Sequence, residues 1–195
     1  HRSAQRSGDD NESAKQHARS LMAFRMLLRA TGVDKKIYAI EQAGKRPIVI
    51  LAPTQAVLDG IDFSALSYEE QVAIVQQHVL FVNWRGEEAT DDDLLTPTAL
   101  ESMFKNDVSK TSFETFNGRS APNVEIAPDA RTNEEATPGA NLLRSKDFEM
   151  PLAKIVYQDG IPGKPRFPTY IYFICKALVP TSFGTNNSSN NNNNT

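Results

Sequence analysis

Thr169–Val179 reads TYIYFICKALV, and this run is the strongest β-strand signal in the 195-residue chain. β-Branched and aromatic residues, which favour strands, fill most of it. Successive side chains of a strand point to opposite faces, and here both faces are apolar: Tyr170, Tyr172 and Ile174 on one, and Ile171, Phe173 and Cys175 on the other. A strand of this kind is typical of the centre of a sheet, or of a sheet covered by neighbours. The same pattern predicts that Cys175 is a small buried residue.

The residues on either side of this strand predict a hairpin before it and a polar tail after it. Asp147–Tyr157 alternates apolar and polar residues, and the Gly/Pro-rich Gln158–Pro168 separates it from the strand. Two such runs with a turn between them predict an antiparallel hairpin. After Pro180 the chain ends in a polar tail over 185–195 that contains NNSSNNNNN. A tract like this cannot bury itself, although Asn side chains can also pair between chains.

The chain before Asn117 reads mainly as helix. We expect one helix from about Glu12 to Thr31, with Gly32 as its C-cap, after a flexible arm over 1–13. Ser67-Tyr68-Glu69-Glu70 ahead of an apolar run matches a capping box. It predicts a buried helix that either reaches Val82 or gives way to a strand there. Thr96-Pro97 marks the start of another helix.

Two further segments are less regular. In Lys36–Ala52 the apolar runs Ile37–Ile40 and Ile48–Leu51 flank a glycine-containing turn, which predicts a small hairpin. Residues 117–141 contain three prolines and two glycines in a polar context and are predicted as a long surface excursion.

Together these elements predict a single α+β domain over residues 14–184. Its N-terminal half is predominantly helical with a small hairpin, its C-terminal part is an antiparallel β-hairpin, and flexible arms lie at both ends, over 1–13 and 185–195. A single cysteine excludes an internal disulfide framework. No apolar run reaches the ~20 residues of a membrane span. We therefore expect a soluble protein, intracellular or in a particle, that makes no membrane contact.

Several patterns bear on catalysis and metal binding. The sequence contains no G-x-S-x-G, H-E-x-x-H, C-x-x-C or G-x-G-x-x-G. His78 stands alone in an apolar run, which predicts a core histidine rather than a ligand or base. We therefore expect no enzymatic activity, no catalytic residue, no metal ligand and no cofactor. The acidic run Glu87–Asp93 holds five carboxylates but lacks the EF-hand order of ligands, so it predicts a solvated loop, with divalent-cation binding as the alternative.

The candidate binding residues lie on the first predicted helix. On a wheel of about 3.6 residues per turn, Leu21, Phe24, Leu27 and Leu28 fall on one side of this helix. The other side carries four cations: Lys15, Arg19, Arg25 and Arg29. The net charge of −3 gives no overall attraction to nucleic acid. A local group of guanidinium side chains can still bind phosphates or an acidic partner, while a solvated surface is the alternative. Met22 and Met26 lie among these cations and favour a partner that covers this side.

Four features together predict a non-enzymatic structural or assembly subunit. These are the arms at both ends, the polar excursion, the strand that is apolar on both faces, and the absence of catalytic motifs. It would belong to a larger particle, filament or complex, such as a virion, and would contact neighbouring copies of itself or other subunits through its terminal arms. The alternative hypothesis is a module that binds a nucleic-acid phosphate backbone or another protein through the basic side of the first helix.

Overall fold

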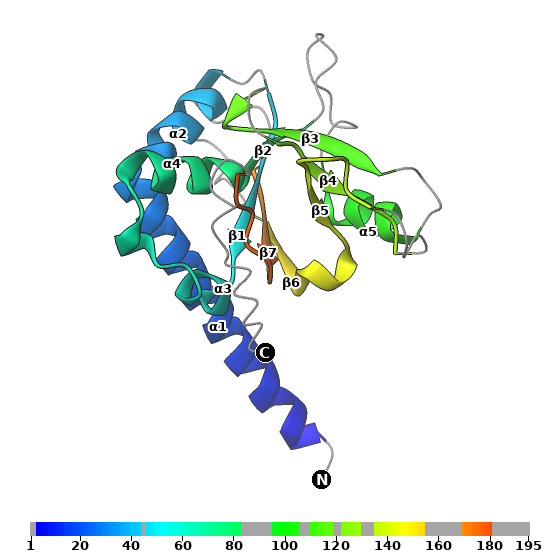
Figure 1. The fold of residues 1–195 in the computed structure, drawn as a ribbon. Helices are drawn as coiled ribbons and strands as arrows, with labels where there is room; N and C mark the ends of the chain where they lie inside the picture. The colour runs from blue at the N-terminus through cyan, green and yellow to red at the C-terminus, as the bar shows by residue number, and fades with distance from the viewer. Residues whose placement is uncertain are drawn as a thin grey trace, which may run out of the picture.

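The computed structural model describes residues 3–43, 46–82, 95–105, 110–118, 122–129, 135–154 and 169–180, the side chains of 3–11 and 150–154 excepted. These residues form a mixed α/β fold in which helices surround a seven-stranded, nearly closed, barrel-like sheet (Figure 1). The α-helices are α1 (Ser3–Ala30), α2 (Val33–Ala43), α3 (Gln55–Asp59), α4 (Tyr68–Gln77) and α5 (Pro97–Lys105). The strands are β1 (Ile48–Pro53), β2 (Val79–Phe81), β3 (Thr111–Thr115), β4 (Val124–Ile126), β5 (Asn141–Leu143), β6 (Phe148–Lys154) and β7 (Tyr170–Ile174).

The strand order in the sheet is β5-β4-β3-β2-β1-β7-β6. β1 is an interior strand, because it pairs antiparallel with β2 on one side and parallel with β7 on the other, with Ile50 opposite Ile171. β4 and β5 form the second parallel pair. All other neighbouring strands are antiparallel.

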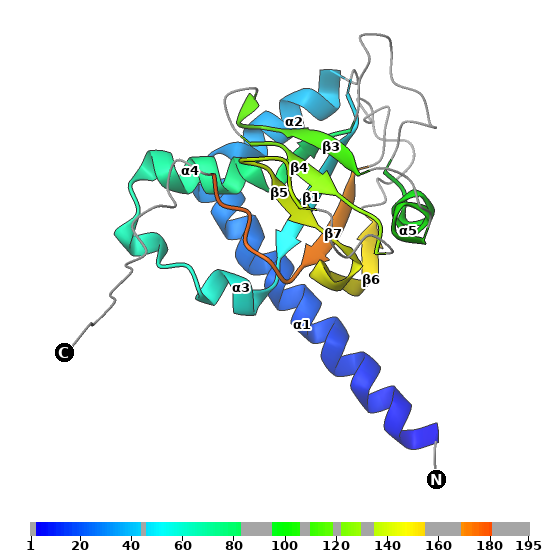
Figure 2. The ribbon, with the colours of Figure 1, turned by 45° about the vertical axis from the view of Figure 1, so that its right-hand side comes forward.

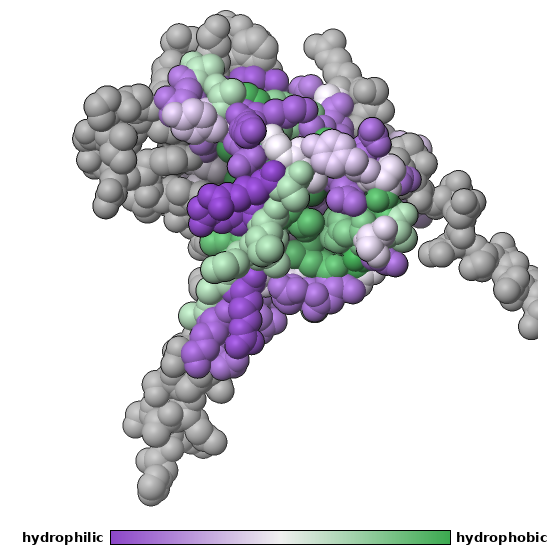
Figure 3. Space-filling model, turned by 90° about the vertical axis from the view of Figure 1, so that its left-hand side faces the viewer, coloured by the Kyte–Doolittle hydropathy of each residue, from purple (hydrophilic) through white to green (hydrophobic). Residues whose placement is uncertain are grey.

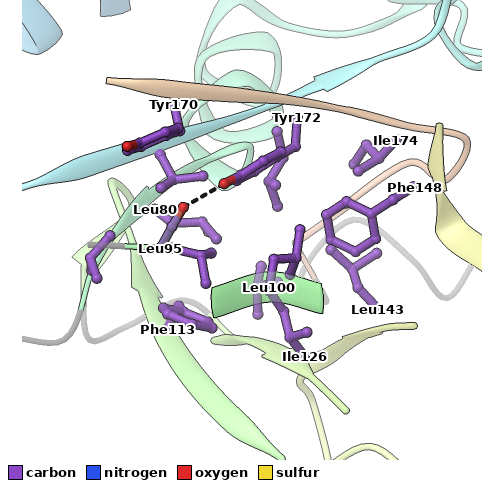
Figure 4. Packing of buried hydrophobic residues seen from close by; sticks show 14 of the residues in the cluster. Leu80, Leu95, Leu100, Phe113, Ile126, Leu143, Phe148, Tyr170, Tyr172 and Ile174 are labelled. Carbon is purple, nitrogen blue, oxygen red and sulfur yellow. Dashed lines mark hydrogen bonds between the residues drawn. The ribbon is translucent and has the colours of Figure 1, made fainter. Parts of the chain in front are cut away.

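Two apolar cores lie on the two faces of the sheet. Inside the curved sheet, Leu100 of α5 packs with Phe148 and Tyr172 (Figure 4). Phe104 of the same helix contacts the ring of Phe148, with the ring centroids 5.4 Å apart. The buried hydroxyl of Tyr172 donates a hydrogen bond to the carbonyl of Leu95, and burial raises the pKa of this phenol. On the outer face, α1, α2 and α4 cover β1 and β7 (Figures 1 and 2) through a second set of buried residues that includes Phe24, Val33, Ile37, Val75, Ile50 and Phe173.

The predicted fold class was wrong. The C-terminal hairpin does form, since β6 pairs antiparallel with β7, but β7 also pairs with β1 and so belongs to one large sheet rather than to an isolated hairpin. Three of the strands, β2, β4 and β5, contain only three residues each. Apolar–polar alternation over three residues is too short to identify a strand. For this reason β4 was not predicted within residues 117–141, which were predicted as a surface excursion.

The N-terminal elements also differ from the prediction. Ile37–Ile40 belongs to α2 and not to a hairpin. Val33, Ile37 and Ile40 recur at helical spacing and face the apolar core on the outer side of the sheet, the outer core, while Tyr38 is exposed. A run of four apolar residues cannot by itself distinguish the two structures. α1 begins at Ser3, so residues 3–13, predicted as part of a flexible arm, continue the first helix. That helix ends where Gly32 takes a φ of +69°, a conformation that favours glycine.

Other local predictions are confirmed. The Glu70 N–H donates to Ser67 Oγ at 3.3 Å and the Ser67 N–H donates to Glu70 Oε2 at 2.8 Å, which completes the capping box of α4. This helix ends at Gln77 and β2 follows, so the strand alternative holds. Thr96 Oγ1 accepts the Ala99 N–H at 3.1 Å at the start of α5.

Cys175 was predicted to be buried, and it is exposed. β7 ends at Ile174, so the alternation of inward and outward side chains does not extend to the next residue. The acidic run over 87–93 and the Asn-rich tail over 185–195 lie outside the described residues.

Glu125 of β4 is a buried carboxylate, 4% exposed, that ties the segment before β5 to the sheet. It accepts the backbone N–H of Thr137 at 2.9 Å and the hydroxyl of the same residue, and its Oε2 lies 3.2 Å from Lys110 Nζ. Burial raises the pKa of Glu125, but the hydrogen bonds from Thr137 and the interaction with Lys110 outweigh this and hold that pKa below its usual value.

We expect Glu125→Gln to destabilise the protein by about 2 kcal/mol, because one carboxylate oxygen becomes an NH₂ donor facing other donors. Urea unfolding followed by circular dichroism measures this change. The matched control is Glu101→Gln, which removes an exposed pair with Lys105 and should cost about 0.3 kcal/mol. Equal stability of the two variants would contradict the assigned role of Glu125.

Candidate interaction surface on the first helix

The structure places the four predicted binding residues on the solvent side of α1. The opposite side packs onto the sheet through Ser20, Phe24 and Leu28, which are buried. We call the exposed side the outer face of α1, and it consists of Lys15, Arg19, Met22, Arg25, Met26 and Arg29. At 1.5 Å per residue this face is about 21 Å long.

Contacts from distant parts of the chain fix the orientation of α1. His17 stacks on Phe173 of β7 with ring centroids 4.6 Å apart, and its Nε2 lies 3.0 Å from Glu149 Oε2 on β6. Ser20 Oγ accepts the backbone N–H of Gln55 at 2.9 Å. The sequence did not predict these partners, because they are far from α1 along the chain and have no motif. Since they fix the rotation of α1, the outer face presents a constant set of side chains.

The outer face of α1 carries four positive charges and contains no carboxylate of its own. No aspartate or glutamate occurs between Ser13 and Val33. Lys15 Nζ lies 3.7 Å from Glu12 Oε2, both side chains being largely exposed. In the part of the chain that the structure describes, Arg19, Arg25 and Arg29 have no ion-pair partner within 4.0 Å. The outer face of α1 therefore attracts anionic groups, such as those of a binding partner.

The two methionines form the apolar part of this face. Met22 is 65% and Met26 68% exposed. Because each residue of a helix turns by about 100°, Arg25 and Arg19 lie at the two edges of the face, about 120° apart, with both methionines between them. Figure 3 shows the apolar band along α1, with hydrophilic side chains beside it and a wider apolar area next to it. Large exposed apolar side chains that gather in this way mark surfaces that partners cover.

His78 has a structural role, as predicted. It is 1% exposed, its Nδ1–H donates to the carbonyl of Ile74 at 2.8 Å, and its Nε2 accepts the backbone N–H of Leu178 at 3.2 Å. Phe24 of α1 meets the ring edge-on. Burial lowers the pKa of His78 to about 4, although the bond to Ile74 opposes this shift. Both ring nitrogens of the neutral imidazole are occupied, so His78 has no nitrogen available for a metal or a substrate.

Two other kinds of site are absent from the part of the chain that the structure describes. Among the described residues, no group of three or more His, Cys, Asp or Glu side chains is placed to hold a metal ion. Within the same residues, no helix has the length and hydropathy needed to cross a membrane.

No protein-family model matches the chain, and no curated protein or solved structure is significantly similar to it.

Proposed function

We propose that this protein is a non-enzymatic assembly or binding subunit of a larger complex, and that it docks through the outer face of α1. The observation that carries the proposal is the combination, on one helix face, of three arginines without an ion-pair partner among the described residues and two largely exposed methionines. Such a face has an energetic reason to be covered, since a partner would bury the apolar side chains and neutralise the charges. The alternative is binding to a nucleic-acid phosphate backbone, which the same cations favour.

The proposal predicts that the chain exists in a complex from which changes on this face release it. Size-exclusion chromatography of an extract from cells that make the protein natively should show the parent well above its own 21.6 kDa. Arg19→Gln with Arg25→Gln, one change at each edge of the face, should shift elution toward the monomer. Glutamine keeps helix propensity, so α1 itself should persist.

The matched control is Lys35→Gln with Lys36→Gln, which removes two exposed charges from α2 and should leave the complex intact. A parent chain that elutes as a monomer would contradict the proposed function. Dispersal of the complex by nuclease, with the control variant unchanged, would support the nucleic-acid alternative instead.

A further inference from the structure

Resting on the proposed function, we infer that the partner covering the outer face of α1 is an acidic amphipathic helix of another protein. Three features of the face identify this partner: the apolar centre, the sign of the charge at both edges, and the straight ridge that α1 presents.

The apolar centre favours a protein over a nucleic acid. Met22 and Met26 are exposed between the arginines, and their thioether side chains adapt to apolar side chains of varied shape. A phosphate backbone offers no apolar surface to them, and contact with it would leave both methionines beside charged groups. A wider apolar area adjoins the band on the same face of the molecule (Figure 3). A partner with its own apolar side chains can bury this surface.

The charges at the edges exclude a symmetric pairing of two copies. Arg25 and Arg29 lie on one side of Met22, and Arg19 lies on the other. If the outer faces of two copies met, cations would stand opposite cations in either orientation, because no carboxylate occurs between Ser13 and Val33. Charges at the flanks of a helical seam decide which partners pair. The complementary partner therefore carries carboxylates on both flanks of its apolar seam.

The ridge on α1 explains why a helix suits this face. Met22 and Met26 are four residues apart, and Ala18 continues the same row. Rows at this spacing pack into the grooves between the corresponding rows of a second helix. The small side chain of Ala18 permits a close approach at one end. A partner helix of about 14 residues spans the distance from Lys15 to Arg29.

A fluorescent peptide of about 21 residues, with leucine at i, i+3, i+4 and i+7 and glutamate on both flanks, serves as the probe. Three comparison ligands test separately whether its charge, its apolar side chains and its being a peptide matter for binding. One carries lysine in place of glutamate, one carries serine in place of leucine, and one is a DNA duplex of about 20 base pairs. Fluorescence anisotropy at about 0.15 M salt, where exposed charges more than a Debye length apart are screened, measures binding to the whole chain.

We expect the glutamate–leucine peptide to bind at least about ten-fold more tightly than each comparison ligand. Met22→Gln with Met26→Gln should weaken it about ten-fold, and Arg19→Gln with Arg25→Gln should do the same, while Lys35→Gln with Lys36→Gln should have no effect. Unchanged thermal unfolding of each variant shows that α1 remains folded.

Two results would overturn the inference: equal binding of the duplex or the serine peptide with no effect of the methionine changes, and no binding of the glutamate–leucine peptide at about 100 μM. If the arginine changes still release the native chain from its complex, the proposed function survives and only this identification of the partner fails.

Discussion

Replacing His78 with phenylalanine is expected to lower the free energy of unfolding by about 3 kcal/mol. Phenylalanine also has an aromatic ring, so the space stays filled while both hydrogen bonds of the His78 side chain are lost. The carbonyl of Ile74 and the N–H of Leu178 are then buried without this partner, and each such loss costs about 1–3 kcal/mol. Urea unfolding at neutral pH measures the change.

His17→Phe is the matched control for this substitution. Its bond to Glu149 lies at a partly exposed site, where the carboxylate side chain is 31% exposed and water can replace the lost donor. The expected cost is about 0.5–1 kcal/mol. A His78→Phe variant no less stable than His17→Phe would show that His78 does not hold the segment around Leu178 in place.

Acid should destabilise the parent protein through the same histidine. The pKa of His78 is about 4 in the folded state, because of burial, against an ordinary value of 6.5. Between these two values the unfolded chain binds the proton and the folded chain does not, so stability falls as the pH falls. The stability contributed by neutral His78 is fully present above pH 6.5 and is lost progressively toward pH 4, at up to about 1.4 kcal/mol per pH unit.

At about pH 5 the parent should have lost about 2 kcal/mol of the stability that it has at pH 7.5. Staying at or above pH 5 keeps Glu125 and the other carboxylates of lowered pKa ionised. In His78→Phe the loss should be smaller by the same amount, since the titrating group is gone. Identical pH profiles for parent and variant would contradict the low pKa of His78.

Predictions from the sequence succeeded where the signal was local. The Ser67–Glu70 capping box, the Thr96-Pro97 helix start and the Gly32 stop each depend on residues within one turn of each other. The outer face of α1 was also predictable, because a helical wheel needs only the sequence of the helix. The α+β fold class failed because it depended on strand pairings that no local pattern encodes.

The contacts that orient the candidate surface show the same limit. Phe173 and Glu149 meet His17 only because β6 and β7 lie next to each other behind α1. Ile37–Ile40 was assigned to a strand since four apolar residues fit both periods, and the packing of α2 against the outer core decides between them. Packing between distant segments, rather than the local secondary-structure propensity of each segment, therefore determines the structure of 37–40 and the partners of His17.

The parallel pairing of β1 with β7 has a consequence for how the chain folds. Val49 pairs with Tyr170, so a loop of about 120 residues must close before β1 and β7 can pair. The entropy of this loop is lost before the pairing can stabilise the sheet. During synthesis β1 is made about 120 residues before β7, so the edge of β1 that pairs with β7 has no partner strand until β7 has been made. Open strand edges promote aggregation. We therefore expect that this edge of β1 must be protected until β7 is available if the chain is to fold efficiently.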